Sequence, residues 1–354
     1  MTTEAREPMA IVADDLTGAC DSGAAFAAAG LRVVVALDGL PVESADVVAF
    51  STETRNFASD EAMRVVREAV SRAGRKVFKK VDSAGRGAFG AEIVAALETS
   101  RASVALVAPS FPGAGRVVRD GVLRVTDFAG QDTEIEVKGL FAPGHAIGVL
   151  RVDAVDEMAR QIAAAVGEGM KLLLCDAVTQ EDLERLVCAG RRVDAAVLWC
   201  GSMGLAKALA GLRRGVSAVP SGRVGRVLLF VGTEHPVTAM QVARLAEEEL
   251  APGRWVHHLT FEERSEHAVR ACFFETDTGA MILTGGDTAA FVLRVLGASR
   301  LVLGGAVSDG IPWGVIEGGV ADGCLVVTKS GGFGDRDSLA DAFAFCERRQ
   351  HETA

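Results

Sequence analysis

Short apolar runs recur along the chain, and most of them are followed by a glycine-rich or polar turn and then by a segment with helical spacing. Several runs are continuously apolar and rich in β-branched residues, which is typical of strands covered on both faces in a parallel sheet. The predicted strands are Met9–Ala13, Arg32–Leu37, Val47–Phe50, Lys76–Val81, Val104–Ala108, Lys171–Asp176, Ala195–Cys200, Arg226–Val231, Trp255–Leu259, Met281–Thr284, Leu301–Leu303 and Leu325–Thr328.

Helical spacing lies between these runs. In residues 60–73, for example, Ala62, Val66 and Val70 recur at intervals that place them on one face of a helix. The predicted helices are Asp60–Ala73, Asp153–Val166, Glu181–Ala189, Val237–Leu250 and Asp287–Leu296. Alternation of strand and helix predicts an α/β fold with mostly parallel sheets flanked by helices.

The length of 354 residues predicts about two domains at roughly 150 residues each. The segment Gly215–Gly225 is rich in Gly, Ser, Val and Pro without helical spacing, so it is the expected boundary. We therefore expect an N-terminal domain over 1–216 and a C-terminal domain over 222–347, with a ligand cleft between them. One large domain with an exposed loop remains the alternative.

The net charge, the cysteine content and the lengths of the apolar runs limit the partners and the cellular locations that we expect for this protein. The net charge of −10 argues against non-specific binding of nucleic acid or of anionic membranes, although it leaves room for a local basic pocket. Seven cysteines without a CxxC pair make a disulfide framework or zinc site unexpected, and reduced thiols fit a cytoplasmic protein. The N-terminus lacks the pattern of a secretory signal, and no apolar run is long enough to span a membrane.

Ligands of parallel α/β sheets bind where the strands end, so the turns after the strands are the candidate sites. The turn after Met9–Ala13 holds Asp14, Asp15, Thr17 and Asp21. Such side chains can bind polyol hydroxyls, hold Mg²⁺ or act as a base, whereas the simpler interpretation is a helix cap with a solvated turn.

Two further turns in the N-terminal half carry cations. Lys80, Asp82, Ser83 and Arg86 lie in a glycine-rich turn whose N–H groups and cations suit an anion, although a flexible turn would have the same composition. Arg116 lies between prolines and glycines, which predicts a rigid loop presenting a guanidinium for bidentate carboxylate recognition.

Three glycine-rich turns follow strands in the C-terminal half. Each alone is a weak signal, but together they predict a phosphate cradle of backbone N–H groups for a nucleotide. His235 is the only histidine placed in such a turn, and no histidine has metal-ligand spacing. The candidate residues are Gly232, Thr233, His235, Gly285, Gly286, Asp287, Thr288, Ser330, Gly331 and Gly332.

These motifs in this order resemble the four-carbon acid sugar kinase family, whose members phosphorylate tetronates such as threonate, erythronate or 3-oxo-tetronate. The resemblance covers nearly the whole chain. The motifs that carry it are DDLTGA (14–19) with Asp21, KKVDS (79–83) with Arg86 and Gly87, FPGAGR (111–116) with the DG at 120–121, TGGDT (284–288) and KSGGFG (329–334).

The resemblance implies that the N-terminal domain binds the acid sugar and the C-terminal domain binds ATP. Lys80, Arg86 or Arg116 would hold the sugar carboxylate, and Asp15, with Asp14 as second choice, would orient or deprotonate the acceptor hydroxyl. Mg²⁺ would be held mainly by the ATP phosphates and water. A homodimer is expected only because symmetric homo-oligomers are common.

The sequence departs from the family pattern at three places. Residues 84–88 read AGRGA where the family has Thr-Leu-Arg-Gly-Asn, His235 replaces a serine, and Gly332 replaces an asparagine. The chain is also several tens of residues shorter than typical members. Two other functions therefore remain open: a sensor that binds nucleotide or sugar acid without phosphoryl transfer, and an unrelated two-domain α/β sugar-acid enzyme such as an isomerase or aldolase.

Overall fold

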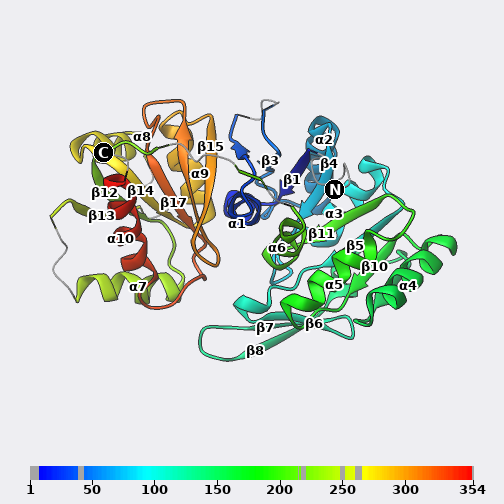
Figure 1. Cartoon of the computed structure of the whole chain (residues 1–354). Coiled ribbons are helices and arrows are strands. Elements are labelled where there is room, and N and C mark those ends of the chain that lie inside the picture. The colour runs from blue at the N-terminus through cyan, green and yellow to red at the C-terminus, as the bar shows by residue number, and fades with distance from the viewer. Residues whose placement is uncertain are drawn as a thin grey trace. The chain divides into compact units, whose positions relative to one another are not determined.

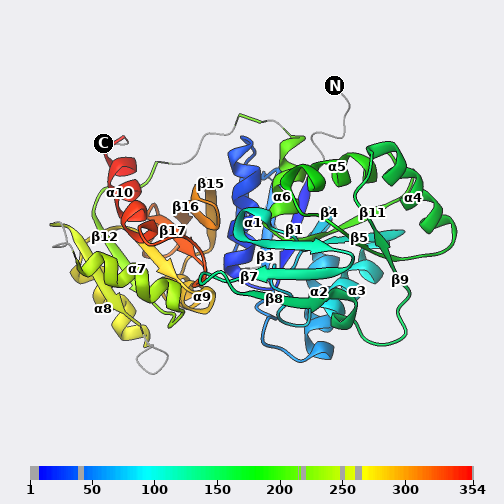
Figure 2. The ribbon, with the colours of Figure 1, turned by 90° about the horizontal axis from the view of Figure 1, so that it is seen from below.

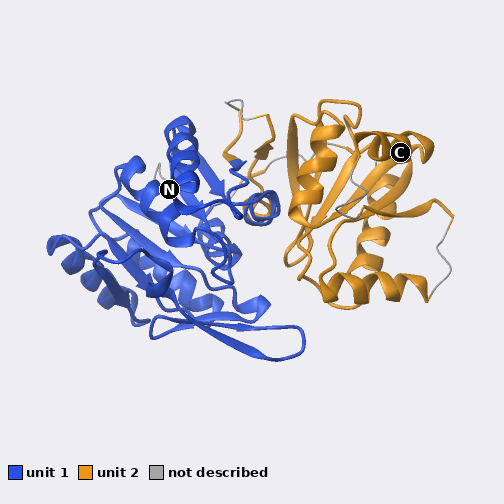
Figure 3. Cartoon of the chain, turned by 180° about the vertical axis from the view of Figure 1, so that it is seen from behind, with its two compact units in different colours: residues 1–22, 49–214 blue, residues 23–48, 215–354 orange. Residues whose placement is uncertain are grey.

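The computed structural model describes residues 8–38, 44–213, 215–216, 221–247, 252–259 and 265–352. The chain divides into two compact units, one of residues 1–22 and 49–214 (unit 1) and one of residues 23–48 and 215–354 (unit 2), as Figure 3 shows. The divisions fall within helix α1 (Leu16–Ala28) and strand β3 (Val47–Ser51). Residues 23–48 thus belong to the C-terminal unit, a grouping that the predicted ranges 1–216 and 222–347 do not contain.

Unit 1 is built on a sheet with the strand order β3-β1-β4-β11-β5-β10-β9 (Figure 1). Every neighbouring pair from β1 to β9 in this order is parallel, as the apolar runs predict. The strands besides β3 are β1 (Met9–Ala13), β4 (Lys76–Lys80), β5 (Val104–Ala108), β9 (Ile147–Leu150), β10 (Leu172–Cys175) and β11 (Val197–Gly201).

Two groups of helices cover this sheet. Helices α2 and α3 pack side by side against β1, β4 and β5, while α4, α5 and α6 pack in a row against β9 and β11 (Figure 1). Their bounds are α2 (Ser59–Ala73), α3 (Phe89–Ser100), α4 (Val155–Gly167), α5 (Gln180–Gly190) and α6 (Met203–Gly211).

A small antiparallel sheet of order β6-β7-β8 adds to unit 1, and β7 and β8 run side by side in Figure 2. Here the expected rigid loop around Arg116 is wrong in part, because Arg116 begins β6 and pairs with Val125. The strands are short and half-exposed, so they lack the long apolar runs that reveal the others. The elements are β6 (Arg116–Arg119), β7 (Val122–Thr126), β8 (Asp132–Glu136) and the 3₁₀ turns η2 (Pro112–Ala114) and η3 (Val137–Leu140).

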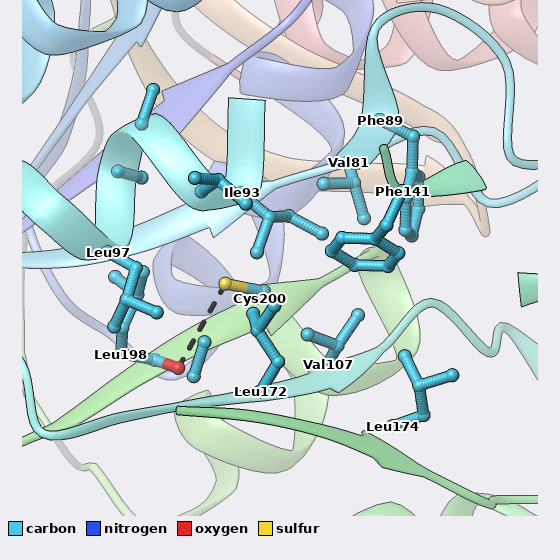
Figure 4. Close-up of a cluster of buried hydrophobic side chains, with 14 of the residues drawn as sticks. Val81, Phe89, Ile93, Leu97, Val107, Phe141, Leu172, Leu174, Leu198 and Cys200 are labelled. Carbon is cyan, nitrogen blue, oxygen red and sulfur yellow. Dashed lines mark hydrogen bonds between the residues drawn. The ribbon is translucent and has the colours of Figure 1, made fainter. Parts of the chain in front are cut away.

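The core of unit 1 lies between α3, the large sheet and the small sheet. Ile93 and Leu97 of α3 point toward Val107 and Cys200 of the sheet in Figure 4. Phe89 packs edge to face against Phe141, with the ring centroids 6.0 Å apart. The segment that follows the small sheet therefore packs against this core through Phe141.

Unit 2 has the strand order β13-β12-β14-β17-β16-β15-β2. Strands β13, β12, β14 and β17 are parallel, and β16, β15 and β2 continue the sheet in antiparallel pairs. Helices α7 and α10 contact each other on one side, and α8 and α9 do so separately (Figure 1). The bounds are β2 (Val33–Ala36), β12 (Arg226–Val231), β13 (Arg254–His258), β14 (Thr278–Thr284), β15 (Arg300–Ser308), β16 (Ile311–Glu317), β17 (Leu325–Lys329), α7 (Pro236–Ala246), α8 (Glu266–Glu275), α9 (Gly286–Val295) and α10 (Ser338–His351).

The predicted α/β fold is confirmed, and each of the twelve predicted strands overlaps an observed one. The sequence interpretation missed β6–β9 and β16, which are short, exposed or antiparallel. The predicted helix Val237–Leu250 corresponds to α7, and its residues 248–250 lie outside the described residues, as do 217–220 of the expected boundary. Across the described ranges, no helix has the length and apolarity that crossing a bilayer requires.

Candidate functional site

A cluster of buried charges lies at the carboxyl ends of β1, β3 and β4 in unit 1. The Arg55 guanidinium lies 2.8 Å from Asp14 Oδ2, 2.7 Å from Asp15 Oδ2 and 3.5 Å from Asp82 Oδ2. The three carboxylates are buried, and the Arg55 side chain is 20% exposed. Because β3, β1 and β4 are neighbours in the sheet, these turns come together, and a single cation bridges three segments that are far apart in sequence.

The charges perturb one another strongly. Burial alone would raise the pKa of Asp14, but the charges of Arg55, Lys80 and Lys79 outweigh it and the pKa is lowered. Burial opposes ionisation of Asp82 as well, yet hydrogen bonds and charge from Arg86 and charge from Arg55 hold its pKa far below the usual range. Both carboxylates are therefore ionised at neutral pH.

Asp15 and Asp14 differ in how their oxygens are used. Asp15 accepts the Gly18 N–H at 2.8 Å, the Thr17 hydroxyl at 2.6 Å and an Arg55 N–H at 2.7 Å, so both of its oxygens are engaged. Asp14 Oδ2 accepts from Arg55, whereas the buried Asp14 Oδ1 has no hydrogen-bond partner among the described residues. A buried acceptor without a donor is costly unless a ligand supplies one.

Gly18 leaves the room that this turn requires. A Cβ at this position would lie 2.6 Å from Asp15 Oδ1 and 2.9 Å from Lys80 Nζ, so any side chain would displace both groups. Beneath them Lys79 Nζ and Glu92 Oε2 form a fully buried ion pair at 2.8 Å. Thr54 Oγ1 donates to the other Glu92 oxygen at 2.7 Å, which links this pair to the turn after β3.

Asp82 organises the second predicted turn. Its Oδ1 accepts the N–H of Ala84 at 2.9 Å, and its carboxylate binds the Arg86 guanidinium through both oxygens at 3.0 and 2.7 Å. The Arg116 guanidinium interacts electrostatically with Asp82, Arg86 and Asp21, and burial lowers its pKa. Asp14, Asp15, Thr17, Asp21, Lys80, Asp82, Arg86 and Arg116 therefore gather at one site, while Ser83 is buried beside Asp82.

Sequence interpretation missed Arg55, the residue that joins the cluster. It lies in the polar turn STETRNF after β3, which looks like a solvated loop. The rule applied to the other turns, that ligands bind where parallel strands end, would have selected it.

Three glycine-rich turns converge in unit 2, because β12, β14 and β17 are adjacent parallel strands. The Gly232 N–H donates to Thr284 Oγ1 at 3.2 Å, and Thr288 Oγ1 donates to the Gly232 carbonyl at 3.1 Å. Thr238 Oγ1 donates to the Gly331 carbonyl at 2.8 Å. The first, second and third turns are thus hydrogen-bonded into one surface.

The side chains of Thr233 and His235 fill the space beside Gly331 and Gly332, where a larger residue would need room for its own side chain. A Cβ at Gly331 would lie 2.7 Å from Thr233 Oγ1, and one at Gly332 would lie 3.1 Å from His235 Nε2. The His235 imidazole thus lies against the position where residue 332 lacks a side chain, and its Nδ1 accepts the Val237 N–H at 3.2 Å. The two departures from the family pattern at 235 and 332 are therefore spatially linked.

The N-termini of α7 and α9 lie at the same surface. Gly285 (φ +90°) precedes α9, and Gly286 begins it together with the exposed Asp287. Helix N-termini present N–H groups without helical partners, which favours a bound anion. The predicted nucleotide-binding residues therefore lie together in one unit and on one edge of its sheet.

Comparisons with known proteins also divide the chain into an N-terminal and a C-terminal portion. A family described as a sugar-binding N-terminal domain matches residues 9–209, and one described as a nucleotide-binding C-terminal domain matches residues 262–339. The D-threonate kinase of Bordetella bronchiseptica is 33% identical, with 96% of this chain and 98% of the relative covered. The 3-oxo-tetronate kinase of Pseudomonas savastanoi pv. phaseolicola is 26% identical, with 96% and 97% covered.

A solved structure is similar over the same length. It is a domain of unknown function from B. bronchiseptica with bound citrate in a domain-swapped dimer, 30% identical, with a TM-score of 0.50 and with 95% of this chain and 97% of that chain covered. The fold and these matches define the class as a two-part α/β kinase with separate sugar-binding and nucleotide-binding portions. Within that class, the chain belongs to the four-carbon acid sugar kinase family.

Proposed function

We propose that this chain transfers the γ-phosphoryl group of ATP to a hydroxyl of a tetronate such as threonate, erythronate or 3-oxo-tetronate. Convergence of the three glycine-rich turns in unit 2 carries the proposal, because it makes a surface of N–H donors suited to phosphates. The charge cluster of unit 1 would supply the complementary site, where Arg86, Arg116 and Lys80 are the cations that would attract a sugar carboxylate.

Asp14 is the better placed of the two predicted catalytic carboxylates. Its Oδ1 is the buried oxygen that needs a donor, and a sugar hydroxyl would supply one. Asp15 already accepts three hydrogen bonds, so its role is to hold Thr17, Gly18 and Arg55 in place. Phosphoryl transfer needs positioning more than a strong base, which suits a carboxylate with a lowered pKa.

Mg²⁺ is expected to arrive with the nucleotide. Within the ranges that the structure describes, no group of three or more His, Cys, Asp or Glu side chains is arranged to hold a metal ion. Mg²⁺ usually keeps several waters and binds through substrate phosphates, where it would neutralise charge during transfer. Asp287, exposed beside the second turn, is a carboxylate of unit 2 that would contact its hydration shell.

The test is ADP release from Mg-ATP with a panel of four-carbon sugar acids, comparing the wild type with Asp14→Asn and Asp15→Asn. We expect turnover with at least one tetronate, and a loss of about 10²-fold or more in kcat for Asp14→Asn with an unchanged ADP Kd. Nucleotide binding without ADP release for every acid would favour a sensor, and failure to bind any adenine nucleotide would favour an unrelated enzyme. Full turnover in Asp14→Asn with loss in Asp15→Asn would reverse the two roles.

We also propose a homodimer in the cytoplasm. The B. bronchiseptica structure is a domain-swapped dimer, and twofold dimers are the commonest assemblies of soluble proteins. Light scattering coupled to gel filtration tests this, and a monomeric mass across the working concentration range would contradict it.

A further inference from the structure

Lys329 occupies an unusual position at the end of β17. It is the only lysine after Lys207 in the sequence, and its side chain is wholly buried. Its Nζ donates to Thr238 Oγ1 at 3.0 Å and to the carbonyls of Ser330, Gly331 and Phe333 at 3.2, 3.3 and 3.0 Å. One ammonium group thus serves four neutral acceptors on the third glycine-rich turn and on α7.

Among the described residues no carboxylate forms an ion pair with Lys329, and burial lowers its pKa to about 7. An amine that loses its proton keeps two donors and gains a lone pair, which carbonyl oxygens repel. The elements packed against β17 and Lys329 are α7, α9, β14 and β16, and their charged or titratable side chains are His235 at the N-cap of α7, Arg244, Asp287, Arg294 and Glu317.

The four hydrogen bonds orient the backbone of the turn. Carbonyls that point inward to Lys329 Nζ leave the adjacent N–H groups facing away from it. In the portion of the chain that is described, the N–H groups of Gly331 and Gly332 have no protein acceptor. Successive N–H groups of this kind form an anion-binding nest.

We propose that Lys329 is a positioning residue of the nucleotide site, whose ammonium group draws the carbonyls of Ser330, Gly331 and Phe333 inward and so presents the N–H groups of Gly331 and Gly332 to a phosphate. The inference deepens the proposed function and rests on it. Its consequence is that the site is organised while Lys329 carries its proton and loosens when the proton is lost.

The size of the effect follows from the fraction of organised protein. With a pKa of about 7, roughly nine-tenths of the ligand-free protein is organised at pH 6 and roughly one-tenth at pH 8. If only that fraction binds, the apparent Kd for MgADP rises about tenfold between these pH values. A bound phosphate also favours the ammonium, so binding at pH 8 should take up a proton.

The experiment is calorimetric titration of MgADP into the full chain at pH 6 and pH 8, each in two buffers of different ionisation enthalpy. Wild type is compared with Lys329→Met and with Lys138→Met, a control that removes an exposed lysine of unit 1. The titration of the phosphate itself is common to all three proteins and cancels in the ratios. Thr238→Val, which removes one acceptor and keeps the ammonium, replaces Lys329→Met if that variant fails to fold.

We expect wild type and Lys138→Met to lose about tenfold more affinity than Lys329→Met between pH 6 and pH 8. Lys329→Met should bind at least about tenfold more weakly at pH 6 and take up no proton at pH 8. Thr238→Val should bind more weakly at both pH values and keep the wild-type pH dependence. Equal pH dependence in wild type and Lys329→Met, or no proton uptake by wild type, would overturn the inference and leave the kinase assignment standing. Absence of MgADP binding at every pH would instead remove the proposed function.

Discussion

Replacing Arg55 by methionine removes the cation that joins the turns after β1, β3 and β4. The methionine retains much of the apolar stem, so the main change is the loss of contacts at 2.8 and 2.7 Å to Asp14 and Asp15 and of the 3.5 Å contact to Asp82. Three buried carboxylates then keep Lys79, Lys80, Arg86 and Arg116 as neighbouring cations.

The expected loss of stability is about 3 kcal/mol at pH 7. Removing one partner of a buried ion pair typically costs about 3–5 kcal/mol, and the lower end applies because Arg55 is 20% exposed. That energy corresponds to roughly a 150-fold increase in the opening equilibrium of the affected strands. A folded domain of ordinary stability tolerates this, so the variant remains measurable.

The loss should shrink in mild acid. In the wild type the lowered pKa values of Asp14 and Asp82 give stability that is present above their unfolded value of 3.8 and is lost only below it, so pH 5.5 and pH 7 are equivalent. Without Arg55, the burial of Asp14 is opposed by the charges of Lys79 and Lys80 but no longer by that of Arg55, so the pKa of Asp14 rises relative to wild type. Arg86 continues to hold the pKa of Asp82 low. Protonation of Asp14 then reduces the stability loss of the variant as the pH falls from 7 to 5.5.

Hydrogen exchange measured by mass spectrometry is the appropriate assay, because the two units need not unfold together. Peptides covering β1 and β4 should exchange faster in Arg55→Met, while peptides covering β14 and β17 of unit 2 serve as the internal reference. Arg55→Lys, which keeps the charge without the planar fork, should lie between the two. A change below about 1 kcal/mol in β1 and β4, or the same change at both pH values, would refute the reasoning.

Three further outcomes are expected. Glu92→Gln should destabilise unit 1 by about 3 kcal/mol by leaving Lys79 buried without its counter-charge, whereas Lys79→Met with Glu92→Leu should be close to neutral; urea denaturation of the singles and the double measures the coupling. Gly232→Ala should abolish tight nucleotide binding, because its Cβ would lie 1.9 Å from Thr288 Oγ1, and nucleotide titration with a melting curve separates that effect from unfolding. Ellman's reagent should leave Cys175, Cys200 and Cys346, which are buried and whose pKa is raised by that burial, unmodified until the chain is unfolded, when all seven thiols react.

The local sequence pattern was sufficient to select the turns that carry the candidate residues, but it did not predict which residues contact those turns. Each turn follows an apolar strand, so Asp14, Asp82, Gly232 and Gly331 could be selected without knowing which strands are neighbours. Arg55 could not be distinguished from a solvated residue, because its partners are contributed by β1 and β4, which pair with each other in the sheet.

The grouping of residues 23–48 was equally beyond local pattern. The run Val33–Ala36 predicts a strand, but nothing in it says that β2 pairs antiparallel with β15, a strand more than 250 residues later. The antiparallel β6–β8 sheet was missed for a related reason, since half-exposed strands carry short alternating patterns that a polar turn also shows.

The two proposed sites would meet the same physical demand, the binding of an anion by a protein of net charge −10, in different ways. The site proposed in unit 1 consists of side-chain cations held by carboxylates, so it is rich in charge while these charges are compensated. The site proposed in unit 2 consists of backbone N–H groups at glycines and two helix N-termini, and the ammonium group of Lys329 is turned inward, toward the carbonyls of the turn. Recognition by charged side chains suits an acid sugar, which must be distinguished from sugars that lack a carboxylate. Bidentate hydrogen bonds from a guanidinium to a carboxylate are directional and provide that distinction. A backbone cradle suits polyphosphate, because N–H donors follow the chain of phosphates without side chains that would crowd it. The acidic total therefore does not oppose either site, since neither depends on an excess of positive charge over the whole molecule.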